Sequence, residues 1–102
     1  MSRPRSELSV LLRETLGSNH VYFQPPESIK MTYPAIVYAL DSIPNVHADD
    51  GVYLSQRRYA VTVVDKDPDS VIAERVAQLP CCRFNRHYTS DNLHHFAFTL
   101  SF

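Results

Sequence analysis

The sequence has very little glycine and very little cysteine, and each shortage excludes a class of site. With two glycines in 102 residues, the chain cannot build the glycine-rich loops that hold phosphate in Walker-type and dinucleotide-binding folds. Its two cysteines, Cys81 and Cys82, are neighbours. A relaxed disulfide needs Cα atoms about 4.4–6.8 Å apart, so a bond between neighbours would not staple a fold. We interpret both as free thiols in a reducing compartment.

Long apolar runs and an excess of charge are also missing. No segment approaches the roughly 18 apolar residues of a membrane span, and Glu7, Arg13 and Glu14 interrupt the region where a signal peptide would be apolar. Ten Lys and Arg against eleven Asp and Glu give a net charge of −1, whereas nucleic-acid modules are usually strongly basic. The sequence therefore predicts one unexported globular domain over residues 1–102, without membrane contact, whose small core would gain from a partner.

Two amphipathic helices are predicted. Leucines recur at helical spacing over residues 5–16, and Gly17 follows the last of them, where a left-handed cap would sit. The second helix is expected to open with Asp67 as N-cap and Pro68 in the first helical position, and to stop at Pro80.

Period-two patterns and turn signals predict five strands, at residues 20–23, 33–40, 52–65, 82–89 and 94–102. Apolar residues on both parities of 33–40 predict a strand that is covered on both faces. At about 3.3 Å per residue, strand 52–65 would exceed 40 Å, so we expect a long hairpin that protrudes from the core. The order α-β-β-β-α-β-β predicts an α+β two-layer domain: a mainly antiparallel sheet of about five strands with two helices on one face.

Residues of metal-ligand type gather in the last third of the chain, at Cys81, Cys82, His87, Asp91, His94 and His95. Neighbouring residues of a strand point to opposite faces, so at most half of this set can converge. A cysteine nucleophile would also need an orienting third group and an oxyanion loop, and neither is evident. We therefore predict no metal, no cofactor and no catalytic residue.

Aromatic residues are more numerous than the predicted core requires. We assign the core to Phe84, Phe96, Phe98 and Phe102, which leaves the tyrosines, Tyr38 included, for the surface. Tyrosine is enriched at protein interfaces, and this surplus favours an assembly protein over an enzyme. The candidate subunit or channel contacts are Asp41, Asp49, Asp50, Tyr53, Arg57, Arg58, Tyr59, Tyr22, Phe23 and Tyr88.

The arginines give a second interpretation. Arg57, Arg58, Arg83 and Arg86 are interleaved with aromatic residues, as on strand surfaces that bind single-stranded nucleic acid. We favour this interpretation only if the four arginines cluster on one face.

Four segments together match a known family: VYFQPP at 21–26, KMTYPAIVY at 30–38, RYAVTVVDKDPDS at 58–70 and FNRHYTSDNL at 84–93. In these segments the chain resembles the small tail-completion, or tail-terminator, proteins of long-tailed bacteriophages and prophages. The resemblance spans most of the chain. It implies an α+β fold and a structural virion protein without catalysis.

The resemblance further implies a homo-oligomeric ring, commonly sixfold, that is assembled in the host bacterial cytoplasm and located in the neck of the virion. Such a ring caps the tail tube protein and joins it to a head–tail connector or stopper protein, while DNA passes through the channel without specific binding. Asp41, Asp49 and Asp50 would then present negative charge that repels DNA phosphates. Another neck protein, or a small nucleic-acid-binding phage module, remains the alternative.

Overall fold

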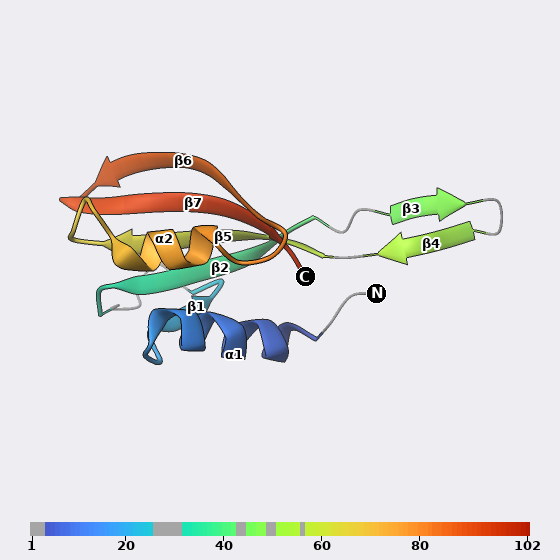
Figure 1. Ribbon diagram of the computed structural model, residues 1–102, viewed down its shortest axis with the longest axis horizontal. Helices are drawn as coiled ribbons and strands as arrows, with labels where there is room; N and C mark the ends of the chain where they lie inside the picture. The colour runs from blue at the N-terminus through green and yellow to red at the C-terminus, as the bar shows by residue number, and fades with distance from the viewer. Residues whose placement is uncertain (1–3, 26–31, 43–44, 49–50, 56) are drawn as a thin grey trace.

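The computed structural model describes the backbone of residues 4–25, 32–42, 45–48, 51–55 and 57–102, and the side chains of these ranges except 45–48 and 51–55. Within these ranges, two helices and seven strands follow each other along the chain (Figure 1). In order they are α1 (Arg5–Leu16), β1 (Val21–Phe23), β2 (Ala35–Ser42), β3 (Asn45–Ala48), β4 (Gly51–Ser55), β5 (Arg58–Asp65), α2 (Val71–Ala77), β6 (Cys82–Ser90) and β7 (Leu93–Ser101).

Helix α1 has the bounds that its leucine spacing predicts. Leu8, Leu12 and Leu16 form its buried stripe. Gly17 adopts φ +84°, and its N–H donates a 2.8 Å hydrogen bond to the Arg13 carbonyl. A left-handed residue closes the helix here because glycine has no Cβ to resist that conformation.

Helix α2 begins later than predicted, and its N-cap is Ser70 rather than Asp67. The Ser70 hydroxyl accepts a 3.2 Å hydrogen bond from the N–H of Ala73 and donates one of 2.7 Å to Asp65. Asp67 instead accepts from the N–H of Asp69, at 2.9 Å, and so folds the chain into a turn ahead of the helix. Aspartate side chains compete for nearby backbone N–H groups, and this makes a run of them a poor guide to where a helix starts.

The five-stranded sheet has the order β1-β2-β5-β7-β6. All its neighbours pair antiparallel except β1 and β2, which are parallel. Both helices pack on the same face, and one apolar cluster unites them with the sheet. The α+β two-layer architecture is therefore confirmed, with a mixed sheet.

The prediction of a single long strand over residues 52–65 is wrong, and the predicted long hairpin is not confirmed. Two strands occupy this stretch, β4 and β5, and only β5 belongs to the main sheet. The pairing of β2 with β5 ends at Ser42 and Arg58, after a register shift. Strands β3 and β4 form a separate two-stranded sheet along the long axis of a molecule that measures 50 × 23 × 23 Å (Figure 1).

Alternate residues of the strands divide the sheet into two faces. The covered face meets the helices and holds the core, formed by Ile36, Tyr38, Tyr59, Val61, Val63, Phe98 and Leu100. The opposite face, which we call the open face, carries the residues that alternate with these core residues along each strand. The expectation that β2 would be covered on both faces holds only at its start, where Ala35 and Ile36 are both buried, whereas Val37 and Ala39 on the open face are half-buried.

Candidate interaction surface

Three of the four arginines singled out in the sequence share the open face. Arg58 of β5 pairs with Ser101 of β7, while Arg83 and Arg86 of β6 pair with Thr99 and Ala97. Ser101, Thr99 and Ala97 are alternate residues of β7, so all three arginines point to the same side. A register shift between Phe84 and Arg86 restores this alignment, because it inserts one extra residue into β6.

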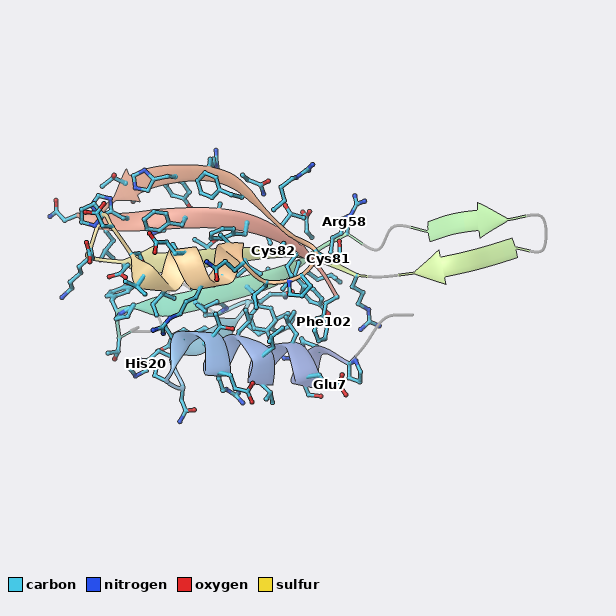
Figure 2. The ribbon with its side chains drawn as sticks, viewed as in Figure 1. Glu7, His20, Arg58, Cys81, Cys82 and Phe102 are labelled. Atoms are coloured by element: carbon cyan, nitrogen blue, oxygen red, sulfur yellow. The ribbon has the colours of Figure 1, made fainter. Side chains whose placement is uncertain are left out.

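A hollow of about 520 Å³ lies on this face between two of the arginines. Its lining consists of Asp41, Arg58, Cys81, Cys82, Arg83, Thr99 and Ser101. Figure 2 shows Arg58 and the two cysteines at the end of the main sheet that lies toward β3 and β4. The side chains of Arg58 and Arg83 are exposed and have no hydrogen-bond or ion-pair partner in the described part of the chain. Two charged donors are thus free for an anionic ligand or partner.

Aromatic rings line both edges of the open face. On β6, Tyr88 stacks on His95 with ring centroids 4.8 Å apart, and the Arg86 guanidinium lies 5.0 Å from the centre of the Tyr88 ring. Tyr22 lies at the opposite edge, on β1, opposite Val37. Such stacks hold their side chains in place at small entropic cost, so the edge is pre-organised for contact.

Small side chains form the middle of the open face: Val37, Ala39, Ala60, Thr62, Ala97 and Thr99. They are half-buried or exposed, whereas Ala35 and Val64 at the far end of this face are buried. Such side chains are short, so a second protein can approach the backbone of this surface closely.

The candidate contact residues divide between the two faces. Tyr22, Asp41, Arg58 and Tyr88 lie on the open face, and Arg57 directly precedes β5. Tyr59 is wrong as an exposed contact, because it is 2% exposed and part of the core. Phe23 packs against the same core, beneath the Arg5 guanidinium. Asp49, Asp50 and the side chain of Tyr53 lie outside the described residues.

The division of the aromatics into core and surface also needs correction. Tyr38 is 1% exposed and fills the centre of the core, where its hydroxyl shares a hydrogen bond with Ser9 of α1. Phe84, which we assigned to the core, is 51% exposed on the edge strand β6. The sequence pattern did not show that Tyr38 is buried and Phe84 exposed. Tyrosine suits a core position where a partner such as Ser9 is placed to bond its hydroxyl, and that partner comes from a distant part of the chain.

The metal-ligand candidates of the last third of the chain do not converge, since His95 stacks on Tyr88, apart from the other histidines and from Cys82. His87 and His94 stack, with 3.0 Å between Nε2 of the first and Nδ1 of the second. Cys82 pairs with Leu100, near the other end of β7. Among the described residues, no group of three His, Cys, Asp or Glu side chains is placed to hold a metal ion.

Burial raises the pKa of the Cys82 thiol to about 11. At neutral pH Cys82 is therefore protonated, and a thiol is a poor nucleophile compared with a thiolate. Cys81 is exposed.

The residues that sequence reasoning missed are the small ones of β7 and its neighbours. Ala97, Thr99 and Ser101 place the three arginines on one side, and His95 supports Tyr88. The alternation along the last strand already separates them from Phe98 and Leu100. The sequence did not reveal this role, because a small residue indicates an accessible surface only once it is known which face of the sheet the helices leave uncovered.

No helix in the described ranges combines the length and the apolar character that crossing a membrane requires. Comparison of the chain with protein-family models, curated proteins and solved structures gave no match. The functional argument therefore depends on the molecule's own surfaces.

Proposed function

We propose that the chain is a structural protein of a phage virion that forms a ring, with six subunits expected, at the end of the tail tube. The ring would cap the tube and join it to a connector or stopper protein of the head. This proposal takes its identity from the four sequence segments that resemble tail-completion proteins. The protein would act by assembly and would have no catalytic residue.

One observation carries the proposal: in the described part of the chain, helices cover only one face of the five-stranded sheet. The open face has stacked aromatic rings at its edge and carries Arg58 and Arg83, whose side chains have no partner among the described residues. A small domain gains stability when a partner covers such a face. Closed rings repeat one such contact between different surfaces of neighbouring subunits.

A small nucleic-acid-binding phage module is the second candidate. Arg58, Arg83 and Arg86 meet most of the condition that would favour it, since they share one face with Tyr88. Against it stands the net charge of −1.

The expected acidic channel depends on Asp41 and on Asp49 and Asp50, which lie outside the described residues. Asp41 lines the same hollow as Arg58.

Tail assembly without this chain tests the first candidate. Tails are assembled with the coding sequence intact or deleted, and the tube ends and virion necks are imaged. We expect the deletion to give tails that lack a terminal ring and fail to join heads, and added purified protein to restore joining. Normal necks in the deletion would contradict the proposal.

A further inference from the structure

The molecule has a second, different surface that complements the open face in charge and chemistry. A groove of about 240 Å³ runs between α2 and the edge strand β6. Phe84, Phe96 and Phe98 provide its apolar walls, and Asp69 and Glu74 contribute the acidic groups. We call this surface the acidic groove.

The carboxylates of the acidic groove are available to a partner. Asp69 and Glu74 are exposed, and their side chains have no hydrogen-bond or ion-pair partner in the described part of the chain. Phe84, beside them, is 51% exposed. A groove that combines aromatic walls with carboxylates suits a guanidinium, which stacks on a ring and pairs with an anion.

The open face presents the matching groups. Arg83 and Arg86 project from β6, Tyr88 lies beside Arg86, and Arg58 adds a third cation. Arg58 begins β5 and Asp65 ends it, close to the turn that leads to Asp69. The two surfaces thus lie on opposite faces, and their charged groups extend toward opposite ends of the sheet. Opposed, complementary surfaces join identical subunits head to tail, as a closed ring requires.

We infer that the open face of one copy, through Arg58, Arg83 and Arg86, docks on the acidic groove of the next copy, at Asp69, Glu74 and Phe84. This inference rests on the proposed ring and assigns its subunit interface. The occupant of the groove is a second copy of this chain. A basic segment of another protein in the groove, or nucleic acid on the open face, would be a different outcome.

Two complementary variants test the interface. The first carries Arg83→Glu and Arg86→Glu, which makes the open face negative. The second carries Asp69→Lys and Glu74→Lys, which makes the groove positive. In each variant alone, the docking surfaces carry charge of the same sign, so we expect assembly to need at least roughly tenfold more protein than the wild type.

Mixing the two variants in equal amounts should restore assembly. The negative face of the first then meets the positive groove of the second, and the unaltered surfaces of the two also attract each other. An alternating ring of six subunits closes. Native mass spectrometry measures the species, and tail tubes are added if the isolated chain is monomeric. Arg13→Glu and Glu14→Lys on α1 are the matched controls, which should assemble like the wild type.

Each outcome decides between the alternatives. Rings that tolerate both charge reversals overturn the inference and leave the ring proposal intact. Loss of assembly that mixing does not rescue, in variants with wild-type circular dichroism, also overturns it. If the first variant assembles normally but no longer shifts single-stranded DNA in a gel, as the wild type does, the arginines serve nucleic acid. A wild-type chain that stays monomeric with tail tubes present contradicts both proposals. If a double variant fails to fold, Arg86→Glu and Glu74→Lys replace the pairs.

Discussion

The covered and open faces are made from the same three central strands, yet alternate residues give them different properties. Val61, Val63 and Phe98 interlock with the helices, while Ala60, Thr62 and Ala97 beside them form a low, uncovered surface. One face is therefore enough to build the core. The other is free to carry charged side chains, which the interior of a small domain would not tolerate.

The largest effect should come from the covered face. Phe98→Ala removes a ring that is 2% exposed, and we expect the free energy of unfolding to fall by about 3–5 kcal/mol. Thr62→Ala, on the open face of the neighbouring strand, is the control and should cost less than about 1 kcal/mol. Urea unfolding measures both. Equal losses in the two variants would refute the division into faces.

The contact between α1 and the sheet should give the next largest effect. Tyr38→Phe leaves the buried hydroxyl of Ser9 without its partner, and we expect a loss of about 1–3 kcal/mol. Ser9→Ala combined with Tyr38→Phe removes both polar groups and should cost less than the sum of the two single changes. Strict additivity in this double-mutant cycle would show that the two hydroxyls do not interact.

The neighbouring residues Cys81 and Cys82 show the same contrast between an exposed and a more buried position. Burial raises the pKa of Cys82 to about 11 from the ordinary value of 9.0. The folded state therefore holds the thiol proton more tightly than the unfolded state, so this contribution to stability is full below pH 9 and is lost as the pH rises toward 11. Because Cys82 is only partly buried, we expect the loss to be about 1 kcal/mol.

Urea midpoints between pH 8.5 and 11 measure this loss, with Cys82→Ala as the variant that removes it and Cys81→Ala as the control. Alkylation gives an independent readout. At pH 8 we expect iodoacetamide to modify Cys81 at least roughly tenfold faster than Cys82, since the thiolate is the reacting form. Faster modification of Cys82 would contradict its burial.

The smallest effect on the isolated chain should come from the charged open face. Arg58→Gln removes an exposed cation that has no partner in the described part of the chain. We expect the unfolding free energy to change by less than about 0.5 kcal/mol. A larger loss in the monomer would give Arg58 a role in the fold and weaken its assignment to an interface.

The sequence predicted the elements that local patterns define. The leucine stripe of α1 and the alternation of β7 carry a complete signal within a dozen residues, and both were located within one residue. The break between β4 and β5 was missed because both flanking segments are rich in strand-forming residues, although four consecutive polar residues, 55–58, interrupt the apolar pattern between them. The cap of α2 was misplaced because Asp67 and Ser70 are both good caps, and only the folded turn decides between them.

The site was less predictable than the fold. The alternation along β5 separated Arg58 from Tyr59, and the surplus of aromatic residues put Tyr88 at the surface. Their convergence on one face depends on strand order and on the bulge in β6. These are properties of long-range pairing. Burial of Tyr38 and Tyr59, and exposure of Phe84, likewise follow from which strand lies at the edge of the sheet.

The mass of the native assembly tests the central claim most directly. The chain is measured by native mass spectrometry over a range of concentrations, alone and after release from tail tubes. Six copies of an 11.7 kDa chain give a closed ring of about 70 kDa, and we expect this species to dominate on tails. A species of 11.7 kDa under every condition, with no protein retained on tail tubes, would contradict the proposed ring.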